Sequence, residues 1–240
     1  MTHSLHRQGS EESLKNDFVM YARCSRGINL DGAEPKVRRI VDIVFDEGPT
    51  NAGDSPHRAT IADGSLTREK ALEYQKNTRG FISCFADREK MKRVLERIRD
   101  EDLGISIVVS GLIDEVFGIA AELGLKPHTV NLSLGIWGKK ELFPDSGALE
   151  LSTMCGHGLV SANLVKQAIS AVKAGTMTPE EGARMIGRPC ICGIVNLGEP
   201  RSCCDLPESR TTNSSDIEPT INYASIMSIH DSRSCIPSPS

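Results

Sequence analysis

The sequence has few aromatic residues, no excess of basic charge and no long apolar run, and each absence excludes a class of protein. Aromatic residues make up 4% of the 240 residues, with one tryptophan, which is too few for the stacking surfaces that bind single-stranded nucleic acid. The net charge of -4 provides no positive surface for general nucleic-acid binding. No apolar run approaches the roughly 20 residues that span a bilayer. We therefore expect neither a nucleic-acid nor a membrane partner.

The N-terminal stretch 1–16 is polar and has no apolar segment of the kind found in secretory signals. Eight cysteines without such a signal favour a cytoplasmic protein, in which cysteines are thiols, metal ligands or catalytic groups rather than disulfides. Neither a G-x-G-x-x-G motif nor a phosphate-binding P-loop is present, so nothing points to a nucleotide.

Apolar periodicity and capping residues predict an alternation of strands and helices. Strands are expected at 17–22, 80–86, 104–110, 128–136, 148–154 and 189–196. Helices are expected at 34–48, 88–102, 111–124, 161–175 and 178–187, with a short one after Thr67, and 49–65 is expected to be a loop.

This alternation predicts one α/β domain over 17–198, built of strand–helix crossover units. Its sheet is expected to be either open and mostly parallel or part of a ferredoxin-like sandwich. Residues 1–16 are expected to form a polar, loosely ordered segment. Residues 199–240 are rich in Ser, Thr, Pro and Asp and are expected to be a disordered tail.

The stretch LSTMCGHGLV at 151–160 is the main candidate for chemistry. It places Cys155 and His157 one residue apart, and PCICG places Cys190 and Cys192 at the same spacing. Alternate side chains of a strand share a face, so Cys190 and Cys192 are expected to point the same way. Together the four residues form a Cys3His set, which binds zinc in many proteins. Zinc is favoured over an iron–sulfur cluster because an imidazole joins the thiols, and an open coordination position would allow an enzyme acting on a small anionic substrate.

A metal-free enzyme is the alternative, with Cys155 as the catalytic thiolate and His157 beside it. A predicted helix N-terminus would lower the pKa of Cys155, and Gly156 and Gly158 would let backbone amides approach an anion. The five residues MCGHG resemble the cysteine motif of the proline racemase and hydroxyproline epimerase family. That resemblance implies an acid/base role for Cys155 in an isomerase. The family also uses a second cysteine motif, which the residues around Cys84 and Cys190 do not match.

Two further interpretations remain open. Ser110 ends a predicted strand, Gly111 opens a predicted helix, and Gly135 lies at the end of another predicted strand. Ligands of α/β proteins gather at such strand ends, so these residues could serve a non-catalytic module that binds a small molecule. Alternatively, all of the cysteines could be buried thiols that pack as small hydrophobic residues.

Overall fold

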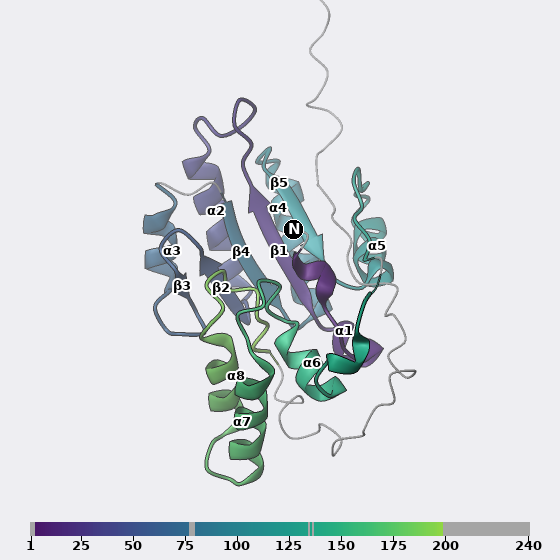
Figure 1. The fold of residues 1–240 in the computed structure, drawn as a ribbon. Helices are drawn as coiled ribbons and strands as arrows, with labels where there is room; N and C mark the ends of the chain where they lie inside the picture. The colour runs from purple at the N-terminus through teal and green to yellow at the C-terminus, as the bar shows by residue number, and fades with distance from the viewer. Residues whose placement is uncertain (1–2, 77–79, 134, 136, 199–240) are drawn as a thin grey trace, which may run out of the picture.

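The structure is a computed structural model that describes residues 3–76, 80–133, 135 and 137–198. Its centre is one sheet of five strands in the order β3-β2-β4-β1-β5, in which all neighbours run antiparallel (Figure 1). The strands are β1 (Phe18–Arg23), β2 (Asn51–Asp54), β3 (Ala59–Thr60), β4 (Gly80–Phe85) and β5 (Ser106–Ser110).

The prediction of an open, mostly parallel sheet is therefore wrong. The strands that a helix joins in sequence are not neighbours in the sheet: β4 lies between β1 and β2, and β1 lies between β4 and β5. Without the two-residue β3, this is the order of a split βαβ, ferredoxin-like arrangement. The chain order of strands and helices is the same in both topologies, so it could not distinguish them.

One face of the sheet is covered by α2 (Glu34–Asp46), α3 (Arg68–Tyr74), α4 (Arg88–Glu101) and α5 (Ile113–Glu122). Phe18 and Met20 of β1 point into this core and are completely buried. The Asp87 side chain caps α4 by accepting a hydrogen bond from the Lys90 backbone N–H. The apolar stripe of α4 lies in the same core, as its helical spacing predicts.

On the opposite face, Val19 and Cys84 of the sheet share a second apolar core with the chain that follows α8 and with α6 (Ser146–Ser152), α7 (Ala162–Lys173) and α8 (Pro179–Gly187). Val19 and Cys84 point from the sheet into this second core. Ser161 caps α7, and Thr178 with Glu181 forms the capping box of α8. Figure 1 shows α7 and α8 side by side, extending away from the sheet.

Three of the predicted strands are wrong. Among the described residues of 128–136 there is no regular structure, and residues 134 and 136 lie outside the described part. The stretch 148–154 falls largely in α6, which Asp145 caps and whose Ala148 and Leu151 are buried one helical turn apart. Residues 189–196 form turns after α8 rather than a strand, since Gly193 adopts a left-handed φ of 74°.

Two segments are more regular than expected. The predicted loop 49–65 contains the β2–β3 hairpin, in which His57 donates its backbone N–H to Asp54 and stacks its ring on Tyr74 of α3. The N-terminal segment contains the short 3-10 helix η1 (His3–His6) and α1 (Glu11–Leu14). Its Arg7 forms a buried ion pair with Asp17, which ties the segment to the sheet.

A further 3-10 helix, η2 (Lys140–Leu142), precedes α6. The expected tail 199–240 lies outside the described residues. Among the helices of the described part, none has the length and apolar character needed to cross a membrane.

Candidate metal centre

Cys155, His157, Cys190 and Cys192 lie together on the second face of the sheet, and we refer to them as the thiol cluster. The sulfur atoms of Cys190 and Cys192 are 3.8 Å apart. The Cys192 sulfur lies 3.5 Å from Nδ1 of His157, and the thiols of Cys155 and Cys190 are close enough for each to shift the pKa of the other. Direct contacts therefore join His157, Cys192 and Cys190, and Cys155 is the neighbour of Cys190.

The cluster is buried on one side and open on the other. Cys155, Cys190 and Cys192 are 3%, 1% and 2% exposed, whereas His157 is exposed to solvent. The imidazole is thus the only one of the four groups that water reaches freely.

Local backbone geometry brings these residues to one place. Cys155 follows the end of α6, and its carbonyl accepts a hydrogen bond from the Gly158 N–H. Cys190 follows α8 and donates its N–H to the Gly187 carbonyl at 2.9 Å. Cys155 and His157 therefore follow the end of α6, and Cys190 and Cys192 follow the end of α8, with α7 between the two pairs in the sequence.

The turn that carries Cys192 lies directly on strand β2. A Cβ atom on Gly193 would collide with the backbone of Ala52, and one on Gly53 would collide with the backbone of Cys192. Glycine at both positions allows this close approach. The Cys84 thiol of β4 donates to the Gly193 carbonyl at 3.2 Å, which fixes the turn from a second strand.

Interactions between the thiols separate their pKa values. The interaction with the Cys190 thiol, followed by burial, raises the pKa of the Cys155 thiol far above its usual range. Cys155 lowers the pKa of Cys190, but Cys192 and burial together raise it by more, so the net shift of this pKa is upward. The hydrogen bond from Cys190 lowers the pKa of Cys192 despite burial. Cys192 is therefore the thiol of the cluster that ionises most readily.

These side chains do not yet surround a common centre. Within the described ranges, no three His, Cys, Asp or Glu side chains form a group that could hold a metal ion as they stand. The five cysteines of this part of the chain are all free and buried: Cys24, Cys84, Cys155, Cys190 and Cys192.

The other predicted site residues lie in different surroundings. Ser110 is completely buried in the sheet, and a Cβ on Gly111 would lie 3.1 Å from both Phe18 and Val116, so the backbone there is packed against side chains. Gly156 is half-buried beside the cluster, and Gly158 is exposed with a left-handed φ of 67°. Gly135 donates its N–H to the Ser133 hydroxyl at 3.2 Å.

Several residues that support the cluster were not predicted from the sequence. Asn51 of β2 is completely buried and donates to the Val195 carbonyl at 2.8 Å. Asn196 donates to Asp17 at 3.0 Å and to the Phe85 carbonyl at 3.0 Å. These bonds satisfy polar groups of the irregular chain after Cys192. The glycine and asparagine of CGIVN could have indicated that the chain turns here, because both residue types favour turns.

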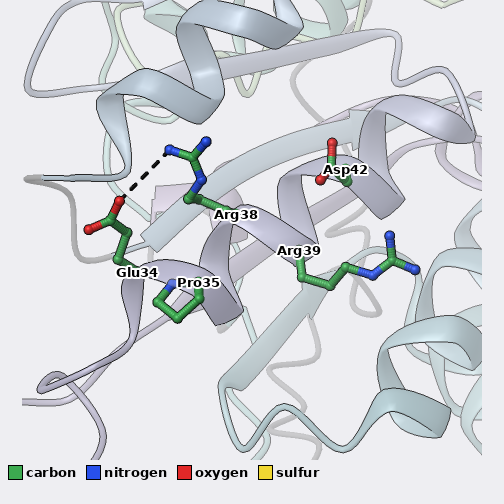
Figure 2. A pocket seen from close by; sticks show the side chains of 5 residues that line it. All are labelled: Glu34, Pro35, Arg38, Arg39 and Asp42. Atoms are coloured by element: carbon green, nitrogen blue, oxygen red, sulfur yellow. Dashed lines mark ion pairs between the residues drawn. The ribbon is translucent and has the colours of Figure 1, made fainter.

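A shallow depression lies on α2, in the helical layer that covers the opposite face of the sheet. It is lined by Glu34, Pro35, Arg38, Arg39 and Asp42, and Figure 2 shows the ion pair between Arg38 and Glu34 in it. Arg39 points out of this group toward Glu101 of α4, with which it pairs at 2.6 Å. Its charged groups are thus already paired, Arg38 with Glu34 inside the depression, and Arg39 and Asp42 with Glu101 and Arg68 outside it.

No protein-family model, no curated protein and no solved structure matches this chain.

Proposed function

We propose that the thiol cluster is a Cys3His zinc centre with Cys155, His157, Cys190 and Cys192 as its ligands. The observation that carries this proposal is the spacing of the donor atoms. Zinc bonds of about 2.3 Å to sulfur and about 2.0–2.1 Å to nitrogen, at tetrahedral angles, place two sulfurs about 3.8 Å apart and a sulfur and a nitrogen about 3.6 Å apart. The observed separations are 3.8 Å for Cys190–Cys192 and 3.5 Å for Cys192–His157.

Two edges of the tetrahedron already have the required length, from His157 to Cys192 and from Cys192 to Cys190. Cys155 is the neighbour of Cys190 that would complete the set. Rotation of the thiols about their side-chain bonds would turn the sulfurs toward one point. A cation there would also stabilise three neighbouring thiolates, which otherwise resist ionisation because two of them have raised pKa values.

The role of this centre is structural. Four protein ligands leave no open coordination position, as in structural rather than catalytic zinc sites. The metal would join the end of α6 to the chain after α8, and so hold the second layer on the sheet. A reducing, cytoplasmic environment suits this role, because the ligands must remain thiolates.

Metal analysis of the full-length protein tests this proposal. The wild-type chain, purified without an affinity tag and with a thiol reductant, is expected to contain about one equivalent of zinc. Cys190→Ser is expected to lose it. Cys24→Ser provides the matched control, because Cys24 is an equally buried cysteine in the core on the other face. Zinc absent from the wild type, with no binding when zinc is added, would refute the proposal.

A second measurement links the metal to folding. Free zinc at about 100 times its dissociation constant stabilises a folded protein by about 2.7 kcal/mol. In a domain of this size, that corresponds to an increase in Tm of roughly 5–11 °C. The increase is expected for the wild type and for Cys24→Ser, and is expected to be absent in Cys190→Ser.

A metal-free thiol enzyme is the second candidate, and the lowered pKa of Cys192 beside His157 favours it. In this case the reactive group is Cys192 rather than Cys155, whose pKa is raised. Rapid alkylation of Cys192 by iodoacetamide at neutral pH, in protein free of zinc and unaffected by added zinc, would support this candidate over the zinc centre.

A further inference from the structure

A carboxylate and an imidazole lie together at the β2–β3 hairpin, on the face of the sheet opposite the thiol cluster. Asp54 ends β2, and its side chain points to the same face as that of Ala52, which belongs to the core beneath α2–α5. Only 1% of the Asp54 side chain is exposed. Its Oδ1 lies 3.1 Å from the backbone nitrogen of His57 and 2.7 Å from Nδ1 of the same residue. A buried carboxylate therefore contacts the imidazole directly.

This contact fixes the tautomer of His57. An ionised carboxylate only accepts hydrogen bonds, so Nδ1 carries the proton that joins the two groups. In the neutral ring, Nε2 is then the nitrogen with the free electron pair. Because Nδ1 faces the buried carboxylate, the exposed edge of the ring is the one that carries Nε2.

An aromatic ring holds the imidazole in this orientation. Tyr74 of α3, which lies beside the hairpin (Figure 1), stacks on His57 with ring centroids 3.9 Å apart and planes inclined by 11°. The His57 side chain nevertheless remains 36% exposed. The structure thus presents an oriented ring nitrogen with a free electron pair at the surface of the molecule.

The charge of Asp54 indicates which reactions suit this nitrogen. Oδ2 of Asp54 is buried and has no hydrogen-bond partner among the described residues, and His57 is the only side chain of this part that pairs with the carboxylate. A buried negative charge is costly unless a positive charge lies beside it. Bond formation at Nε2 makes the ring cationic, because Nδ1 keeps its proton, and so lowers this cost.

A cation follows the imidazole in the sequence. Arg58 is exposed, and it forms no ion pair within the described ranges. A guanidinium is well suited to binding the oxygens of a phosphoryl group. Phosphoryl transfer requires of a protein mainly that it positions the reacting groups and stabilises their charge. An exposed, oriented imidazole next to an arginine meets this requirement.

We propose that His57 is a phosphoryl-acceptor site, which takes a phosphoryl group at Nε2 from a phosphoramidate, the chemical class that includes a phosphohistidine of another protein. The Nε2 electron pair forms the bond to phosphorus. The bond between phosphorus and the donor nitrogen breaks, and its electron pair leaves with that nitrogen, which is already protonated in the donor and departs as a neutral base. The Nδ1 proton stays on the ring, which becomes an imidazolium paired with Asp54. Asp54 acts as a positioning residue.

Reaction of the full-length chain with phosphoramidate itself tests this proposal. At mildly alkaline pH, phosphorus NMR follows the adduct and tandem mass spectrometry locates it. His57 is expected to react at least about tenfold faster than His128, because a hydrogen bond to a charged group stabilises the cationic ring more than one to a neutral group. His128 is the internal control, since it is also exposed but its Nδ1 lies 2.7 Å from the neutral hydroxyl of Thr129.

Three variants identify the source of the reactivity. Asp54→Asn retains an oxygen for the His57 N–H but loses the charge, and is expected to slow the reaction of His57 by about 10- to 100-fold. Asp63→Asn is the matched control, because Asp63 lies in the same region but accepts the backbone N–H of Ser65 at 2.8 Å. Tyr74→Phe retains a ring for stacking. Both of these variants are expected to react at the wild-type rate.

A measurement on the wild type can overturn the proposal whether or not the variants fold. Long-range proton–nitrogen correlation spectra distinguish the two tautomers, and we expect the neutral His57 ring to carry its proton on Nδ1. A proton on Nε2 instead, or a reaction of His57 no faster than that of His128, would overturn the proposal. So would a folded Asp54→Asn variant in which His57 reacts at the wild-type rate.

Discussion

Replacing Gly193 by alanine tests whether the turn of the thiol cluster lies on strand β2. Gly193 has a φ of 74°, and a Cβ at this position would collide with the backbone of Ala52 and Gly53. Two costs therefore add. The left-handed conformation costs an alanine about 1–2 kcal/mol, and overpacking a buried contact costs about 1–3 kcal/mol. We expect Gly193→Ala to destabilise the protein by about 2–5 kcal/mol in total.

Gly175→Ala is the matched control, since it separates the two costs. Gly175 follows α7 with a φ of 69°, but no atom lies within 4 Å of the position that a Cβ would take. Only the conformational cost of about 1–2 kcal/mol applies there. The difference between the two variants therefore measures the contact with β2 alone.

Equilibrium unfolding in urea, followed by far-UV circular dichroism, measures both changes. The protein is kept reduced and treated with a chelator, so that metal binding does not contribute. If Gly193→Ala is no less stable than Gly175→Ala, the turn does not contact β2 and the placement of Cys192 on the sheet is wrong. If it is less stable by about 1–3 kcal/mol, the close approach of the two backbones is confirmed.

Three further changes test other parts of the structure. Arg7→Met leaves the buried carboxylate of Asp17 without its ion pair and is expected to cost about 3–5 kcal/mol in urea unfolding; a loss below about 1 kcal/mol would show that the pair is solvated. Cys84 and Cys155 have raised pKa values in the folded protein, so folding favours their neutral thiols. The stability that this contributes is fully present below the unfolded thiol pKa of about 8.5 and is lost as pH rises above it. Unfolding of metal-free protein between pH 7 and 10 should show this loss, and Cys155→Ser should reduce it; a stability that is constant or rises over this range would contradict these pKa directions. Thr178→Ala removes the capping box of α8 and is expected to lower the free energy of unfolding by about 1 kcal/mol, whereas an unchanged midpoint would show that the cap adds no stability.

Most of the longer helices, though not α6 or α1, could be predicted because the residues that define them are local. Asp87, Ser161 and Thr178 each cap the helix that follows, and the apolar stripe of α4 repeats at helical spacing. Cap and stripe depend on residues three or four positions apart. These features can be recognised without knowing what surrounds the helix.

The sheet order could not be predicted in this way. It depends on which strands pair across the chain, and β1 pairs with β4 and β5 rather than with β2. The stretch after α8 shows a related error. Ile194 and Val195 are buried because they cover the sheet from above, although their apolar character suggested a strand within it. Burial alone does not distinguish a strand from a segment packed on one.

The two cysteine-bearing motifs lie close together because of the helices between them, and not because alternate residues of a strand share a face. Cys155 and His157 precede α7, and Cys190 and Cys192 follow α8. The helices contain 12 and 9 residues, and so are about 18 Å and about 14 Å long. They pack side by side in Figure 1, so the second helix returns the chain most of the way to where the first began. Two helices of similar length with a short connection at 174–178 therefore bring the residues before them close to those after them. All four side chains therefore lie at the base of a helical hairpin, and no strand is needed to bring them together. The lengths of α7 and α8 thus help to determine the site. Removing one helical turn from α8 alone increases the difference in helix length by about 5 Å and is expected to separate the two pairs and abolish zinc binding, while removing one turn from each helix is expected to preserve it.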